Sequence, residues 1–241
     1  MYSLLRGVKA VFLDLGNTLA YYAPSPPGII ARVLKRWGYS VPLAKVSEAL
    51  SEAEEAYMPV RRKILKRFKA DPLRYVELPL DYEIEVNLYM LKLLGIPPDE
   101  RLAREIALEF RKTETVALYP DVIPVLSELR ERGLKLGIVS NASSFAEEVI
   151  KDKGLASLVD FYVISYAVGY EKPHPKIFEE ALRRAGTKPA ETIHVGDSYE
   201  ADVVGARNAG ITPILVDREK SYNTVDCIKI HTLWELLDIL T

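Results

Sequence analysis

The spacing of hydrophobic residues divides the chain into two kinds of region. From Gly28 to about Lys112 the hydrophobic positions recur every three or four residues, which is the period of amphipathic helices. From Tyr119 onward, short apolar runs alternate with such helical stretches. The first region therefore predicts a block of helices. The second predicts repeated β-α units, with a parallel sheet between two layers of helices.

The apolar runs that we predict as strands are short and rich in valine, isoleucine and leucine. They span residues 11–13, 134–139, 161–165, 192–195 and 212–216, with 228–230 as a short edge strand. The run at 11–13 precedes the block of helices, so the helices form an insertion into the sheet. The sequence thus predicts an α/β protein with a Rossmann-like parallel sheet core, helices on both faces and a separate all-helical domain.

Proline and glycine mark the ends of the predicted helices. Gly38 closes the first helix of the insertion and Pro59 separates the second from the third, whereas the proline-rich residues 21–28 predict a linker. The predicted helices are 29–37, 43–53, 64 to about 71, 83–94 and 99–112 in the insertion, then 122–132, 145–153, 175–185, 201–209 and 231–240. We expect a capping or loop role for His174, which lies beside one helix start.

Composition and charge argue against several classes of protein. The 241 residues are 49% hydrophobic and 27% charged, as in an ordinary globular protein. A net charge of -2 and a pI near 6.0 predict no nucleic-acid partner and no anionic membrane partner. No apolar run approaches the ~20 residues that span a bilayer. The absence of glutamine and the abundance of Glu, Lys and Arg are typical of thermophiles.

The cysteine content and the N-terminus both favour a cytoplasmic protein. The single cysteine, Cys227, excludes an intrachain disulfide and argues against a cysteine-based zinc site, which fits a reducing compartment. The first residues lead directly into the first predicted strand, without the pattern of a signal peptide. We therefore expect a cytoplasmic location.

Polar residues that suit phosphate chemistry follow four of the predicted strands and are almost absent from the strands themselves. In chain order they are Asp14 and Thr18, Ser140 and Asn141, Lys172, and finally Asp197 and Asp202. The carboxyl ends of parallel strands open on the same edge of a sheet. We therefore expect these residues to meet in one site.

This series resembles the motif pattern of the haloacid dehalogenase-like hydrolase superfamily, in which an aspartate nucleophile, a Ser or Thr, a Lys and an acidic pair follow successive strands. The resemblance covers residues 7–20 and 116–220. It implies a catalytic core of residues 1–20 and 116–241. The helical insertion, residues 21–115, stands where the family has its cap, which closes over the site and selects the substrate.

The resemblance implies a Mg²⁺-dependent phosphatase that acts on a small phosphorylated molecule. A carboxylate nucleophile accepts the phosphoryl group as an aspartyl-phosphate, which divides the hydrolysis into two easier steps. By the resemblance, Asp14 is this nucleophile. Asp14, the main-chain carbonyl of Gly16 and Asp197 would hold the Mg²⁺, which offsets the repulsion between carboxylates and a phosphate dianion.

The other motif residues supply positive charge and hydrogen-bond donors in this interpretation. Lys172 and Ser140 would act as catalytic groups on the transferring phosphoryl group. The substrate phosphate would be bound by Thr18, Ser140, Asn141 and Lys172. Asp202 would orient Lys172 or a metal-bound water.

One position departs from the family pattern. Family phosphatases usually have a second Asp, a general acid and base, two residues after the nucleophile, where this chain has Gly16. Such a group contributes typically ~10²–10⁴-fold to the rate.

Three functions stay open as a result. The first is a phosphatase for substrates with good leaving groups, or a phosphatase that recruits a surrogate acid from the cap or Asn17. The second is a metal-independent 2-haloacid dehalogenase. The third is a catalytically weak binding or regulatory protein. Asp197 and Asp202 favour the first, because a dehalogenase needs no cation site. The sequence leaves open the identity of the substrate and whether the protein is a monomer or a homodimer.

Overall fold

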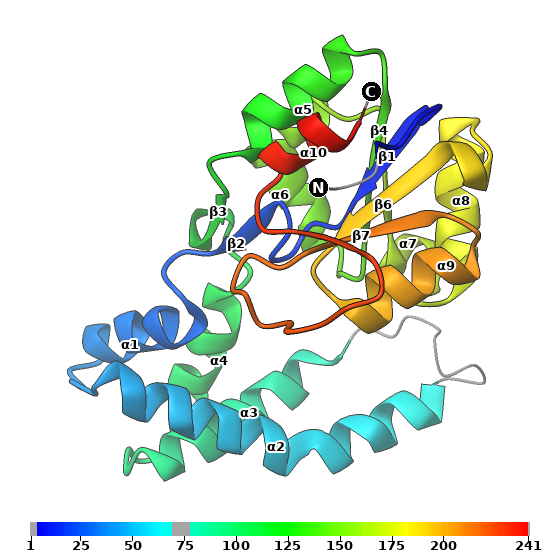
Figure 1. The fold of residues 1–241 in the computed structure, drawn as a ribbon. Coiled ribbons are helices and arrows are strands. Elements are labelled where there is room, and N and C mark those ends of the chain that lie inside the picture. Colours follow the sequence, from blue (N-terminus) through cyan, green and yellow to red (C-terminus); the bar gives the residue numbers. More distant parts are fainter. Residues whose placement is uncertain (1–3, 69–77, 241) are drawn as a thin grey trace. The chain divides into compact units, whose positions relative to one another are not determined.

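The computed structural model of the protein describes residues 4–68 and 78–240 (Figure 1). The described residues form two compact units. One unit contains the residues up to Tyr21 and those from Leu118 onward, and the other contains the described residues between Tyr22 and Ala117. In the part of the chain that is described, no helix combines the length and the hydrophobicity that crossing a bilayer requires.

The first unit is built on a six-stranded parallel sheet with the strand order β5-β4-β1-β6-β7-β8. The strands are β1 (Ala10–Leu13), β4 (Lys135–Ser140), β5 (Phe161–Ile164), β6 (Thr192–Gly196), β7 (Thr212–Val216) and β8 (Ile228–Ile230). β1 lies inside the sheet and all four of its residues are buried, in keeping with its apolar sequence. The predicted fold class, an α/β protein with a parallel sheet and a helical insertion, is confirmed.

Helices cover both faces of this sheet (Figure 1). On one face lie α5 (Val122–Glu131), α6 (Phe145–Asp152) and α10 (Trp234–Ile239), and on the other α8 (Pro175–Ala185) and α9 (Gly205–Asn208). The short helix α7 (Ser165–Val168) follows β5. Phe12 of β1 and Phe178 of α8 belong to one cluster of buried side chains, so this cluster joins the sheet to α8.

The chain after β6 differs from the predicted helix at 201–209. A π-helical turn, Tyr199–Val204, comes first and is continued by α9. The Ser198 hydroxyl accepts a hydrogen bond from the backbone N–H of Ala201 at the start of this turn. The Asp202 carboxylate accepts one from the backbone N–H of Ser198 at 2.9 Å. The side chain of Asp202 thus holds the wider turn, which periodicity in the sequence does not indicate.

Side-chain caps decide where two other helices of this unit begin. The predicted cap at His174 is confirmed, since its Nδ1 accepts a hydrogen bond from the backbone N–H of Lys176 at 3.1 Å. The helix predicted at 231–240 begins only at Trp234. The Glu235 carboxylate accepts hydrogen bonds from the backbone N–H groups of His231 and the residue after it, and this holds a turn before the helix.

The second unit consists mainly of four helices, α1 (Pro26–Arg36), α2 (Leu43–Phe68), α3 (Leu80–Leu93) and α4 (Glu100–Glu109). Their buried side chains form one cluster that includes Ile30, Val46, Met90 and Ile106. These residues come from all four helices, as the three-to-four-residue spacing of apolar positions predicts. The helical insertion therefore has a hydrophobic core of its own.

The residues predicted as a linker, 21–28, contain regular structure instead. β2 (Ala20–Tyr22) pairs with β3 (Val116–Leu118) in a two-stranded sheet. α1 begins at Pro26, because proline is well accommodated in the first turn of a helix, where its missing N–H is not needed.

The predicted break at Pro59 is also wrong, since α2 runs through it. The ring of Tyr57 contacts those of Tyr82 and Tyr89 in α3, with centroids 6.2 and 5.9 Å apart. Tertiary packing beside the proline thus outweighs its low helix propensity. The predicted helix end near residue 71 lies outside the described residues.

A nearly buried carboxylate stabilises the second unit. The side chain of Glu109 is 5% exposed and lies 3.1 Å from Arg32, 2.9 Å from Arg36 and 2.6 Å from Lys112. Hydrogen bonds from Arg36 and Lys112 hold the pKa of Glu109 at about 2, although burial acts in the opposite direction. The ionised form of Glu109 is therefore bound more strongly in the folded than in the unfolded chain.

We expect Glu109→Gln to lower the free energy of unfolding by ~1–3 kcal/mol at neutral pH, because it leaves cations partly unpaired. The pKa is lower in the folded protein than its ordinary value of 4.5. The stabilisation is hence complete above about pH 4.5 and is lost as the pH falls toward 2, so the difference from wild type should shrink in acid. Urea unfolding at several pH values measures this. Glu48→Gln, at an exposed position of α2, should change the stability by less than ~0.5 kcal/mol; equal losses in both variants would contradict the role of Glu109.

Candidate active site

Strand pairing brings Asp14, Ser140 and Asp197 to the same edge of the sheet. β1 pairs in parallel with β4 on one side and with β6 on the other. Asp14 follows the last residue of β1, Ser140 ends β4, and Asp197 follows the last residue of β6. The backbone N–H of Asp14 donates to the carbonyl of Val195 at 2.9 Å and so fixes the first residue beyond β1. The expected convergence of strand ends is present in the structure.

Lys172 lies between two carboxylates. Its Nζ donates hydrogen bonds to Oδ1 of Asp14 at 2.5 Å and to Oδ1 of Asp202 at 2.6 Å. The side chain of Lys172 is only 2% exposed, and those of Asp14 and Asp202 are 9% and 2% exposed. Charges so far from water persist only when they are paired. The contact between Asp202 and Lys172 corresponds to one of the two roles that the sequence suggested for Asp202.

The backbone of Lys172 is held by the side chain of Asn141. The Nδ2 of Asn141 donates to the carbonyl of Lys172 at 2.9 Å, and its Oδ1 accepts from the backbone N–H of Lys172 at 2.7 Å. These bonds join the loop after β4 to the loop that carries the lysine. The motif pattern predicts substrate binding for Asn141 but not this contact, because the two residues are 31 positions apart.

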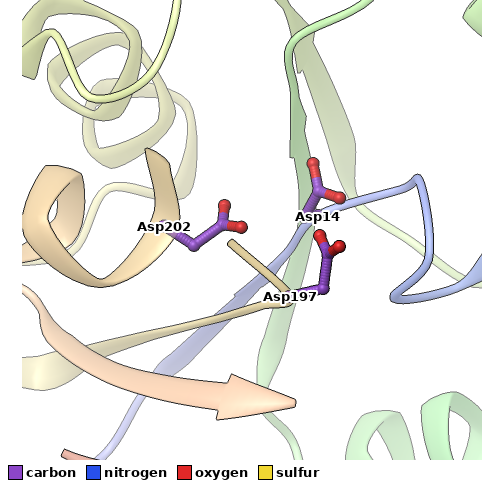
Figure 2. Close-up of side chains that lie close together, drawn as sticks. All are labelled: Asp14, Asp197 and Asp202. Carbon is purple, nitrogen blue, oxygen red and sulfur yellow. The ribbon is translucent and has the colours of Figure 1, made fainter. Parts of the chain in front are cut away.

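Three carboxylates form an acidic cluster, with Asp14, Asp197 and Asp202 turned toward one another (Figure 2). One oxygen of each lies within 4.8 Å of the others. Carboxylate oxygens are the ligands that hard divalent cations prefer, so the donor set fits such an ion. Oδ1 of Asp202 already accepts two side-chain hydrogen bonds and its Oδ2 accepts the backbone N–H of Ser198. Asp14 and Asp197 are therefore better suited to direct ligation than Asp202.

Burial and neighbouring charges shift the pKa values of these groups in different directions. Burial raises the pKa of Asp14 from 3.8 to about 6, although the charge of Lys172 counteracts it. Burial, together with the charge of Asp202, also raises the pKa of Asp197. The pKa of Asp202 is lowered because Lys172 and His194 outweigh the effect of burial. Burial would lower the pKa of Lys172, but the two carboxylates raise it. In acid, a proton therefore binds Asp14 before Asp202.

His194, which belongs to none of the predicted motifs, contacts Asp202. It lies within β6, is fully buried, and has its Nε2 2.8 Å from Oδ1 of Asp202. Its Nδ1 has no hydrogen-bond partner among the described residues. The signal in the sequence was an ionisable residue between Ile193 and Val195, inside an otherwise apolar strand.

The turn after Asp14 leaves open space beside Gly16. A Cβ built on this glycine meets no atom within 4 Å, and its φ is not positive. The left-handed position of the turn is the next residue, Asn17, with φ 52. The side-chain amide of Asn17 donates to Oδ2 of Asp197 at 3.3 Å. The backbone would therefore accept a larger side chain at position 16.

Thr18 is held through its backbone. Its carbonyl accepts hydrogen bonds from Arg218 at 3.2 and 2.7 Å, and its buried hydroxyl has no partner among the described residues. Arg218 also pairs with Asp121 at 2.9 Å and lies 3.8 Å above the ring centroid of Tyr119. Arg218 thus fixes the chain after the Asp14 turn. Thr18 and Arg218 are 200 positions apart, and no local pattern in the sequence predicts their contact.

Known proteins match nearly the whole chain. Residues 8–210 match the family described as haloacid dehalogenase-like hydrolase. The glyceraldehyde 3-phosphate phosphatase of Methanopyrus kandleri is 32% identical over 243 residues, which cover 97% of this chain and 97% of that protein.

Solved structures resemble the fold over a similar span. The protein YfnB of Bacillus subtilis, solved with magnesium bound, has a TM-score of 0.74 and 18% identity over 96% of this chain and 98% of its own. A 2-haloacid dehalogenase of Pseudomonas syringae has a TM-score of 0.62 and 26% identity over 96% of this chain and 97% of its own. Phosphatases and dehalogenases thus both occur among the similar proteins.

Proposed function

Because this chain belongs to the haloacid dehalogenase-like hydrolase family and is a phosphoric monoester hydrolase, we propose that it removes the phosphate group from a small phosphorylated sugar. The observation that carries the chemistry is the buried Lys172 between Asp14 and Asp202, with Asp197 beside them. A relative that is similar along its full length, the glyceraldehyde 3-phosphate phosphatase of Methanopyrus kandleri, supports this class of substrate.

Asp14 is the nucleophile of the proposed reaction. A carboxylate oxygen of Asp14 attacks phosphorus and forms an aspartyl-phosphate, while the bond from phosphorus to the ester oxygen breaks. The ester oxygen leaves with the bonding electron pair and takes a proton from water to give the free alcohol. Water then attacks that phosphorus, which releases inorganic phosphate and restores the carboxylate. Lys172 places a fixed positive charge beside Asp14, and Ser140 and the backbone N–H of Asn141 provide donors for the phosphoryl oxygens. Thr18 is a further candidate for contact with the substrate phosphate.

Mg²⁺ is the cation that we propose for the acidic cluster, held by Asp14, Asp197 and the main-chain carbonyl of Gly16. When bound, the ion supplies positive charge that offsets the repulsion between the carboxylates and the substrate dianion. Asp202 acts on Lys172 rather than on the ion, because its oxygens already accept hydrogen bonds from the protein.

We also propose a division of labour between the two parts of the chain. Residues 1–20 and 116–241 form the catalytic core, and residues 21–115 form the helical cap. All the proposed catalytic, metal-binding and substrate-binding residues lie in the core. The hydrophobic cluster of the insertion supports a cap that is stable in itself.

The proposed function is tested by phosphate release from p-nitrophenyl phosphate and from a panel of phosphorylated sugars that includes glyceraldehyde 3-phosphate. We expect turnover with Mg²⁺ and none after chelation. A dehalogenase is the second candidate, in view of the similar Pseudomonas syringae enzyme. Halide release from 2-chloropropionate in the presence of chelator would replace the phosphatase with it. No turnover on any of these substrates would favour a binding or regulatory protein.

The Mg²⁺ requirement should depend on pH in a defined direction. The pKa of Asp14 is raised to about 6, so below that pH a proton competes with the cation for this carboxylate. We expect the Mg²⁺ concentration for half-maximal activity to be constant above about pH 7 and to rise up to ~10-fold for each pH unit below about 6. Mg²⁺ titrations of activity between about pH 5 and about pH 8 measure this, and a constant requirement over that range would contradict it.

A further inference from the structure

We propose that His194 is a positioning residue that holds Asp202, and through it Lys172, in the arrangement that the nucleophile Asp14 requires. This inference rests on the proposed roles of Asp14 and Lys172. His194 touches neither of the reacting groups, and the hydrogen-bond partner of its side chain among the described residues is Asp202.

Three buried side chains form a continuous series of hydrogen bonds. Nε2 of His194 lies 2.8 Å from Oδ1 of Asp202, and the same oxygen lies 2.6 Å from Nζ of Lys172. The imidazole and the ammonium group thus approach one carboxylate oxygen from two directions. The side chains of His194, Lys172 and Asp202 are 0%, 2% and 2% exposed, so water does not substitute for either donor.

Besides Lys172 and His194, two further contacts restrict the position of the Asp202 carboxylate. A Cβ on Gly196 would come within 2.1 Å of Cγ of Asp202, so the carboxylate lies directly against the backbone of β6. Its other oxygen is held by the backbone N–H of Ser198. The donor from His194 is thus the contact that sets the position of Oδ1 independently of Lys172. Without it, Lys172 would be the one remaining side-chain donor to that oxygen among the described residues.

Stability alone does not explain a histidine at this position. An ionised carboxylate only accepts hydrogen bonds, so Nε2 of His194 carries the hydrogen and donates it. Nδ1 is then left buried without a partner among the described residues, whichever its protonation state, and an unpaired buried polar atom costs folding free energy. The Phe178 ring packs against the imidazole in a T-shaped arrangement, with the ring centroids 5.0 Å apart. An aliphatic side chain would pack against Phe178 without leaving an unpaired polar atom. The geometry therefore points to a functional reason for the imidazole.

The experiment compares wild type with His194→Leu and His194→Gln, assayed with p-nitrophenyl phosphate and saturating Mg²⁺. We expect His194→Leu to lower kcat by ~10–100-fold with little change in KM, and to lower the melting temperature modestly, because the loss of the hydrogen bond to the buried Asp202 carboxylate outweighs the removal of the unpaired nitrogen. Glutamine can place an amide N–H near the position of Nε2, so His194→Gln should recover part of the kcat. Ile193→Val in the same strand is the matched control for a core change, and it should lower the melting temperature slightly and leave kcat unaltered.

The outcomes separate this role from the proposed function. A wild-type kcat in His194→Leu would overturn the role of His194 alone. Equal kcat losses in the leucine and glutamine variants, in parallel with lower melting temperatures, would show that the histidine is merely structural. A wild-type protein that releases no phosphate would overturn the proposed function itself, and this role with it.

Discussion

Asp14→Asn should reduce kcat for p-nitrophenyl phosphate by more than ~10³-fold, because an amide oxygen does not form the proposed aspartyl-phosphate. The fold should persist. Asparagine has the same shape, and its carbonyl oxygen still accepts the hydrogen bond that Lys172 donates to Asp14 at 2.5 Å. The measurement is steady-state turnover, with mass spectrometry of acid-quenched wild-type protein to find the phosphoryl group on the peptide that contains Asp14.

A matched carboxylate-to-amide change elsewhere separates chemistry from stability. Asp99 caps α4 by accepting backbone hydrogen bonds, and asparagine caps helices about equally well. Asp99→Asn should therefore leave kcat unchanged. Full activity in Asp14→Asn, or a phosphoryl group trapped on another residue, would remove Asp14 from the role of nucleophile.

Gly16→Asp should speed the hydrolysis of alkyl phosphates by ~10²–10⁴-fold, because it adds an acid that protonates the leaving oxygen. The structure allows the change. Position 16 is exposed, has open space around a Cβ and has no positive φ, so an aspartate fits without strain. Hydrolysis of p-nitrophenyl phosphate should change much less, since nitrophenolate leaves without protonation. The ratio of kcat/KM for the two substrate types is the quantity to measure.

Gly16→Asn is the control, since it adds a side chain of nearly the same size without a proton to deliver at neutral pH. It should give no acceleration. If Gly16→Asp also has no effect on alkyl phosphates, then leaving-group protonation does not limit the rate. A surrogate acid or a different slow step would then account for the glycine.

Much of the fold could be predicted because its signals are local. The run from Val11 to Leu13 is apolar, ends at Asp14, and becomes the inner strand β1, all within a few residues of sequence. The three-to-four-residue period from Gly28 onward predicted the helical insertion for the same reason. Where the local sequence signal conflicted with tertiary packing, the prediction of secondary structure was wrong. Pro59 does not break α2, because residues of α3 pack beside it, and 201–209 begins with a π-helical turn held by the side chain of Asp202.

The sequence by itself determined which residue types follow the strands, and hence that Asp14, Ser140, Lys172 and Asp197 belong to one edge of a parallel sheet. It also determined that position 16, a glycine, provides no general acid for the leaving group. Only the tertiary structure decided the contacts among these groups. Lys172 meets Asp14 across 158 positions of sequence, and Arg218 meets Thr18 across 200. Such contacts depend on strand register and on the paths of several loops at once, which no local pattern encodes. His194 is the clearest case, because a buried imidazole in an apolar strand has meaning only once Asp202 is seen beside it.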